Sequence, residues 1–476
     1  MARFCSECGT EFANEAAKYC HNCGKEFSEF PQNACHHEQD CIEYYFHLGY
    51  KYHDITNLLK TYHGITMCVR TLKRKLQKYN LKKRNVNFDE QYLRDIIKTE
   101  MEGAGQLSGY RKIWHLLRIN HHLHAPRSVV ARVVHELNPQ ASNERKGNKL
   151  KRRKYLSYGP NHCWHIDVVV AKGKTPPNVI NIFYVLFDNT NIFKIFVNKY
   201  EFHTGYDKLK PFGFPIHAAI DGFSRKVLWL EICKSNNSPK EPTILYLDCV
   251  IEHGGCPLLT RSDYGTENGD IAAIQCYFHD DENAHKYGTS TRNQRIENWW
   301  SHFRKSCTDW WINFFKDLRD SGSVNFESTL HRQCLWFCFQ DVIQASLNKM
   351  KAYWNTHYIR SSRHETTPGV PDLLFYLPKD SGGVNCLVRV SQDKIDEMKL
   401  RHFEDTNDES SYQEYFQYVM DHEGVRYPDS PKEALDLFCY LTEKLELKIP
   451  FVMKFNVHYI CQNALLFRNK SFRLLR

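Results

Sequence analysis

Three acidic residues in three different local patterns place the strongest constraint on how this chain folds. Asp167 ends "CWHID", in which apolar and polar residues alternate as in a strand with one buried face. Asp263 lies in the glycine-flanked turn "RSDYGTENG", and Glu297 lies in "TRNQRIENWW", which we predict to be helical. Whether these acids are surface charges or corners of one metal site depends on a fold that brings the three segments together.

The length and composition indicate several globular modules. A chain of 476 residues corresponds to about three domains. No run of about 18 apolar residues is present, so we expect no membrane partner. The N-terminus has no apolar signal region, so the 18 cysteines are expected to be reduced thiols and metal ligands in the cytosol or nucleus.

Two CxxC knuckles stand at the N-terminus, Cys5 with Cys8 and Cys20 with Cys23, each followed by a glycine. Four thiolates suit tetrahedral Zn²⁺, and a segment this short has little core of its own. The spacing therefore predicts a zinc ribbon over residues 1–30, with the bound metal supplying its folding energy.

Residues 38–84 show the spacing of a helix-turn-helix unit. Two amphipathic segments flank Gly64, and eight Lys or Arg occur between Val69 and Arg84 without one acid. A helix seated in the major groove of DNA carries such charges on its exposed faces. The candidate DNA-binding residues here are Arg70, Lys73, Arg74 and Lys75. A plain three-helix bundle with a basic face is the alternative.

Residues 86–154 are expected to form a second helical DNA-binding unit that ends in a basic linker, "RKGNKLKRRK". Such a run suits phosphate backbones and nuclear import, and Arg152 and Arg153 are its candidate contacts; a solvated linker is the alternative. The unit also carries several histidines, which we expect to be exposed rather than metal-bound: His115, His121, His122 and His124.

Four motifs in fixed order carry a family resemblance over residues 42–378: "CWHID", "GFPIHAAIDGFSRKVLWLEI", "RSDYGTENG" and "NQRIENWW". They resemble the DDE-type integrase catalytic core of retroviral integrases and DNA transposases. The greatest likeness is to domesticated integrase-core proteins of eukaryotes. The resemblance implies a multidomain protein with an α/β ribonuclease H-like core at residues 155–378, preceded by the zinc ribbon and the helix-turn-helix units.

The resemblance also implies that Asp167, Asp263 and Glu297 hold two Mg²⁺ or Mn²⁺ ions, with a spacing of 34 residues between the last two. Strand cleavage and transfer is an in-line displacement at phosphorus, and two metals about 3.5–4 Å apart stabilise the attacking and leaving oxygens. The weaker candidate DNA contacts lie around Glu297, where phosphates would approach the start of a helix: Asn293, Gln294, Arg295 and Lys305. Asp221, in the predicted turn "DGFSRK", is the rival acid and should point elsewhere.

An insertion over residues 168–204 departs from the family pattern, in which a sequence like "GYDKLKPFG" follows the first Asp directly. The 37 inserted residues begin immediately after Asp167 and are rich in Ile, Phe, Asn, Lys and Tyr. They are either a retained intron or gene-model error, or an added β-hairpin that turns at "DNTN". A displacement of about 1 Å beside a metal ligand would be costly for catalysis.

Residues 380–476 are expected to form a C-terminal domain of unknown role. Its clearest element is an amphipathic helix with Ala434, Leu437, Phe438 and Leu441 on the inner face. The whole sequence predicts a nuclear, DNA-binding enzyme that catalyses metal-dependent strand cleavage and transfer for DNA integration, and homo-oligomerisation stays open. The alternative is a nucleic-acid-binding protein descended from such an enzyme that no longer catalyses.

Overall fold

The computed structural model describes residues 37–83, 89–137, 157–168, 209–234, 239–263, 265–288, 293–361, 367–403 and 411–446, and the backbone of residues 181–187 and 191–197. The predicted zinc ligands Cys5, Cys8, Cys20 and Cys23 lie outside the described residues, as do Arg152 and Arg153.

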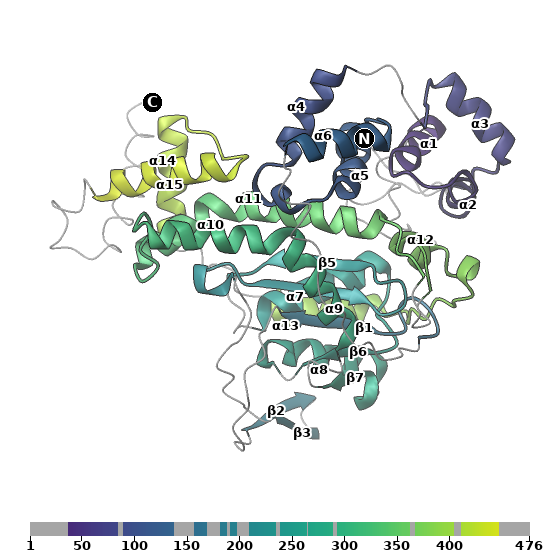
Figure 1. The fold of residues 1–476 in the computed structure, drawn as a ribbon. Helices are drawn as coiled ribbons and strands as arrows, with labels where there is room; N and C mark the ends of the chain where they lie inside the picture. Colours follow the sequence, from purple (N-terminus) through teal and green to yellow (C-terminus); the bar gives the residue numbers. More distant parts are fainter. Residues whose placement is uncertain are drawn as a thin grey trace, which may run out of the picture.

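A five-stranded mixed sheet forms the centre of the fold (Figure 1), in the order β5-β4-β1-β6-β7. The strands are β1 (Trp164–Val168), β4 (Ile216–Asp221), β5 (Val227–Ile232), β6 (Thr260–Ser262) and β7 (His285–Tyr287). Strand β4 pairs antiparallel with both β1 and β5, whereas β6 runs parallel to β1 and to β7. This arrangement is consistent with a ribonuclease H-like integrase core, and β4 and β5 confirm the hairpin expected around "DGFSRK".

Helices cover both faces of the sheet, because consecutive side chains of a strand point to opposite faces and both faces are apolar. One face packs against α9 (Gln294–Phe303), α10 (Asp309–Asp320) and α11 (Thr329–Thr356). The other face, which includes Trp164, Ile166 and Trp229, packs against α7 (Lys240–His253), α8 (Gly269–His279) and α13 (Gln392–Phe403). The core is therefore a three-layer α/β/α arrangement.

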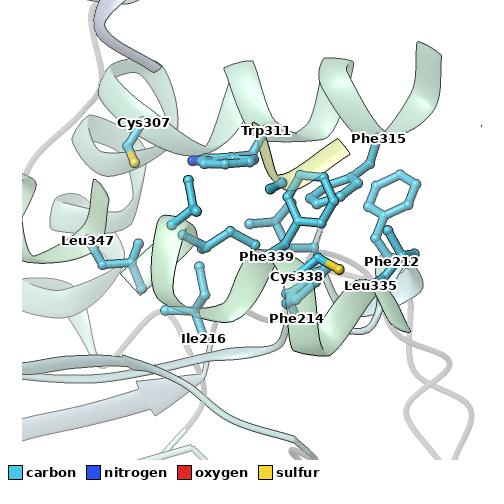
Figure 2. Packing of buried hydrophobic residues seen from close by; sticks show 14 of the residues in the cluster. Phe212, Phe214, Ile216, Cys307, Trp311, Phe315, Leu335, Cys338, Phe339 and Leu347 are labelled. Atoms are coloured by element: carbon cyan, nitrogen blue, oxygen red, sulfur yellow. The ribbon is translucent and has the colours of Figure 1, made fainter. Parts of the chain in front are cut away.

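The largest hydrophobic cluster of the described residues lies between the sheet and helices α10 and α11. Figure 2 shows Phe212 and Phe214, which precede β4, and Ile216, the first residue of β4, facing Trp311 and Phe339 of these helices. Phe212 and Phe214 each stack on Phe315 of α10, with ring centroids 5.5 and 5.3 Å apart. Stacked aromatic rings thus join the segment before β4 to α10.

The C-terminal helices α14 (Ser411–Glu423) and α15 (Pro431–Glu446) belong to the same hydrophobic cluster as α11. Phe416 and Phe438 are almost fully buried in it, as are the four inner-face residues expected of α15. In the described part of the chain the C-terminal region therefore extends the core rather than forming a separate one. No helix among the described residues is long and apolar enough to cross a membrane.

The insertion forms two strands, β2 (Asn181–Phe187) and β3 (Asn191–Val197), which pair antiparallel in a sheet of their own. Phe187 pairs with Asn191, so the chain reverses at "DNTN" as the hairpin alternative requires. Neither strand pairs with the five-stranded sheet.

Two small helical units precede the core. The first comprises α1 (Glu38–His47), α2 (Tyr52–His63) and α3 (Val69–Lys78), and Gly64 ends α2 with a φ of 66°. The second comprises α4 (Glu90–Glu100), α5 (Tyr110–His121) and α6 (Arg127–Leu137). Each unit has its own hydrophobic cluster, with the helices at the positions expected from the apolar spacing.

Specific contacts attach the first unit to the core through α12 (Pro371–Tyr376). Asp372 of α12 forms a largely buried ion pair with Lys226, at 2.5 Å, and accepts a hydrogen bond from Tyr50 at 3.3 Å. Tyr62 of α2 donates a hydrogen bond to the Tyr376 carbonyl at 2.6 Å. The side chains of α12 therefore join the sheet and the first unit, and we call Lys226, Asp372 and Tyr50 the Asp372 link.

The second unit rests on α11, and its histidines correct one expectation. His115 Nε2 lies 2.8 Å from the Thr356 hydroxyl of α11, and burial lowers its pKa to about 3. His124 is also buried, beside His47 of α1 at 3.1 Å. The expectation of exposure was therefore wrong for His124, which is buried, and His115 is half-buried by its contact with α11. His122 is exposed as expected.

Candidate functional site

Asp167 lies near the end of β1, on the sheet face that α9 covers. Its side chain is buried, and Oδ1 has no hydrogen-bond partner in the structure. The Trp300 side chain interacts with this carboxylate and favours its charged form, but the effect of burial is larger. A bound cation is a partner that would suit this oxygen.

Asn293 fixes the position of Glu297 relative to Asp167. Its side chain is fully buried immediately before α9, donates to the Ile166 carbonyl at 2.9 Å, and lies 2.6 Å from His165 Nδ1. Both contacts are to β1, so the start of α9 is held against the strand that carries Asp167. Asn293 is thus a structural link, and its interpretation as a DNA contact was wrong.

Asp263 follows β6, which is parallel to β1, so the two acids lie at the same edge of the sheet. Ligand sites of α/β sheets gather at the carboxyl ends of parallel strands. Asp263 Oδ1 accepts hydrogen bonds from the Gly265 amide and from Asn268 Nδ2, both at 3.3 Å. These two donors orient the carboxylate within the turn.

A fourth carboxylate, Glu267, lies in the same turn and was missed from the sequence. It is buried, and its Oε1 accepts a hydrogen bond from Asn268 Nδ2 at 3.2 Å. Gly265 makes room for it, since a Cβ at this position would lie 1.9 Å from Oε1. The signal in the sequence was a second acid four residues after Asp263 in a turn that requires a nearby glycine.

The charges of these acids show that they are neighbours. Burial raises the pKa of Asp167 well above its usual range, and the charges of Asp263, Glu297 and Glu267 act in the same direction. Burial also raises the pKa of Asp263, and raises that of Glu267 to about 7 with a contribution from Asp263. Two strands, a turn and a helix thus bring four carboxyl groups into one electrostatic cluster.

Among the described residues, no group of three His, Cys, Asp or Glu side chains is arranged closely enough to be a ready metal site. The acids are therefore neighbours without being packed as a ligand set. Like charges in a buried place repel one another, and a shared cation would be needed to draw them together. The raised pKa values and the unpartnered oxygen of Asp167 suit such a cation.

Asp221 has a different role, as a structural acceptor in the β4–β5 turn. Its carboxylate accepts hydrogen bonds from the backbone amides of Asn161, Phe223 and Ser224, at 2.8, 3.2 and 2.7 Å, and from the Ser224 hydroxyl. Fully buried and supplied with donors, it stabilises the hairpin and does not join the cluster of acids.

The candidate DNA-binding residues fall into different environments. Arg70, Lys73 and Arg74 are exposed on α3, whereas Lys75 forms an ion pair with Glu38 of α1. Near α9, Lys305 is exposed and Arg295 is half-buried beside His165.

The structure therefore defines an α/β domain whose mixed sheet carries buried carboxylates at one edge. Residues 193–373 match the family described as integrase core domain. The matched range contains Asp263, Glu267 and Glu297 and begins after Asp167. No curated protein matches the chain. An integrase core domain indicates an integrase- or transposase-like function with DNA as substrate, and such domains typically use divalent metal ions.

Proposed function

We propose that this chain binds DNA and catalyses metal-dependent strand cleavage and transfer of the integrase type. The observation that carries the proposal is the buried carboxyl group of Asp167, which lies in one electrostatic cluster with Asp263 and Glu297. Asp167, Asp263 and Glu297 would hold Mg²⁺ or Mn²⁺. When bound, the ions would stabilise the attacking and leaving oxygens at the phosphorus.

The side chains around the acids would contribute positioning. Asn293 holds α9 against β1, and Asn268 and the Gly265 amide orient Asp263. These contacts limit the movement of three ligands that come from different elements. Pre-set ligand positions reduce the cost of ordering the site when metal and substrate bind.

The exposed face of α3 would bind the duplex. Arg70, Lys73 and Arg74 point away from the hydrophobic cluster of the first unit and are free of the ion pair that engages Lys75. Lys305, exposed just after α9, is the corresponding candidate beside the acids. The N-terminal zinc ribbon, a nuclear location and a domesticated origin remain parts of the proposal that rest on the sequence.

The rival proposal is a DNA-binding protein that no longer catalyses. It is favoured by the insertion, since the inserted residues follow Asp167 directly in the sequence and β2 and β3 pair with no strand of the five-stranded sheet. Deletion of residues 168–204 distinguishes the two. The enzyme proposal expects strand transfer to be preserved or improved, because the family joins these flanks directly; the rival expects none with or without the insertion.

The direct test is nicking of supercoiled DNA and strand transfer by the full-length protein with Mg²⁺ or Mn²⁺. Asp167→Asn, Asp263→Asn and Glu297→Gln should each reduce activity more than about 100-fold, because even outer partners of metal sites usually contribute 10- to 100-fold. DNA binding should persist in all three. The matched control is Glu282→Gln, an exposed acid outside the cluster. Full activity of Asp263→Asn, or an inactive wild type that binds DNA, would leave the rival proposal standing.

A further inference from the structure

A row of buried polar side chains reaches Asp263 from the sheet face opposite Asp167. Trp229 of β5 and His217 of β4 lie on the face covered by α7 and α8, and Asn268 ends the turn that follows Asp263. Trp229 Nε1 donates to His217 Nδ1 at 2.9 Å. Asn268 Nδ2 donates to both Asp263 Oδ1 and Glu267 Oε1.

The remaining polar atoms of His217 and Asn268 complement each other. An indole N–H can only donate, so His217 Nδ1 is the acceptor and the proton of the neutral ring is on Nε2. Asn268 uses its amide group on the carboxylates, so its Oδ1 is left as an acceptor. His217 Nε2 and Asn268 Oδ1 are both buried without another partner.

The two side chains are neighbours, because Asn268 acts on the electrostatics of the His217 ring. A side-chain interaction with Asn268 acts on His217, in opposition to the burial that lowers the histidine pKa to about 4. Both side chains are almost completely buried, at 1% and 0% exposure, so bulk solvent does not reach either of them. A donor and an acceptor left over at neighbouring buried positions are expected to pair.

We propose that Trp229, His217 and Asn268 form a one-directional hydrogen-bond chain that positions the carboxylates of Asp263 and Glu267 for cation binding. Every link has the same direction, from the indole N–H to the carboxylates. The direction matters because exchanging Oδ1 and Nδ2 of Asn268 would place its oxygen against two carboxylates. The same exchange would place its N–H₂ group against the N–H donor of His217. The histidine tautomer, set by Trp229, therefore fixes the orientation of the amide that holds Asp263.

This inference rests on the metal site of the proposed function, but its main test does not require catalysis. Mn²⁺ affinity of the full-length protein is measured by the electron paramagnetic resonance of free Mn²⁺. His217→Leu and Asn268→Leu should weaken binding about 10- to 100-fold. His217→Gln should restore most of it, because its amide can accept from Trp229 and donate to Asn268.

The matched control is Trp164→Phe. Trp164 is buried in the same hydrophobic cluster as Trp229, and its Nε1 also donates a hydrogen bond, to Asn161 Oδ1 at 2.9 Å. Trp164 is not part of the proposed hydrogen-bond chain. It should leave Mn²⁺ affinity unchanged, whereas Trp229→Phe should weaken it. Circular dichroism and denaturant unfolding identify variants that fail to fold. If His217→Leu fails to fold, the Mn²⁺ affinity of His217→Gln is compared with that of the wild type instead.

The tautomer gives a second measurement without metal. Nitrogen-15 spectra of the wild type, with the His217 signals assigned by their loss in His217→Gln, should show a proton on Nε2 and none on Nδ1. A proton on Nδ1, or wild-type Mn²⁺ affinity in His217→Leu and Asn268→Leu, would overturn the positioning chain. If the wild type binds Mn²⁺ in a way that depends on His217 and Asn268 but never cuts DNA, only the proposed reaction is overturned. If the wild type binds no Mn²⁺, both the proposed reaction and the hydrogen-bond chain are overturned.

Discussion

Replacing Glu267 by glutamine should stabilise the metal-free protein at neutral pH. Burial and the neighbouring Asp263 raise the pKa of Glu267 from 4.5 to about 7. Below pH 4.5 the carboxyl group is protonated in both the folded and the unfolded chain, so its burial carries no charge penalty. As the pH rises towards 7, the unfolded chain loses the proton before the folded chain does, so the free energy of unfolding falls across this window.

The magnitude follows from the two pKa values. The difference between 4.5 and about 7 corresponds to about 3 kcal/mol, at about 1.4 kcal/mol per pH unit. Glutamine keeps the volume of the side chain and can still accept the hydrogen bond from Asn268, but it never becomes charged. We therefore expect Glu267→Gln to raise the free energy of unfolding by up to about 3 kcal/mol at pH 8 and to have little effect at pH 4.5.

The assay is urea unfolding followed by tryptophan fluorescence in EDTA, at several pH values from 4.5 to 8. The control, Glu282→Gln, changes an exposed acid and should stay within about 0.5 kcal/mol of the wild type throughout. An effect of Glu267→Gln that is equal at both ends of the pH range, or a loss of stability at pH 8, would refute the reasoning. A gain in stability together with weaker Mn²⁺ binding would place Glu267 among residues that trade stability for function.

Three further predictions concern other parts of the chain. Metal analysis of the full-length protein should find one zinc, lost on serine substitution of the two N-terminal CxxC pairs; its absence from a reduced sample would contradict the ribbon. Neutralising Arg70, Lys73 and Arg74 together should reduce the slope of log affinity for duplex DNA against log salt concentration by about 3. The control, Lys75→Gln, should change this slope less than neutralising any one of those three residues, because Lys75 pairs with Glu38. An unchanged slope in the triple variant would exclude α3 as the phosphate contact. Asp372→Ala should cost about 3–5 kcal/mol in urea unfolding, since it leaves Lys226 buried without its partner, and a cost below about 1 kcal/mol would show that the pair is effectively solvated.

The sequence predicted the elements that carry the acids, because their local patterns are strong. Alternation marks β1, the turn residues of "DGFSRK" mark the hairpin of β4 and β5, and apolar spacing marks α15. In each case the periodicity of the element coincides with the side that becomes buried, so local and tertiary preferences agree.

The residues that hold the site together were harder to predict. Asn293 and His217 are polar residues whose burial depends on partners 127 or 12 positions away, and no local pattern distinguishes them from surface polar residues. Glu267 escaped notice for a related reason, since one acid in a turn is usually a surface charge. The packing of α14 and α15 on α11 was also hard to predict. The apolar face of a helix predicts that this face is buried, but it does not predict which element covers it.

The Asp372 link has a geometric consequence for any duplex bound on α3. Because Lys226 lies between β4 and β5 and Tyr50 belongs to the first helical unit, side-chain contacts connect the first unit to the domain that carries the acids. Under the proposed function, the protein would cut at a constant number of base pairs from the groove that α3 occupies. A variant without the Asp372 link would be expected to cut at a wider range of distances from the α3 site while still cutting DNA.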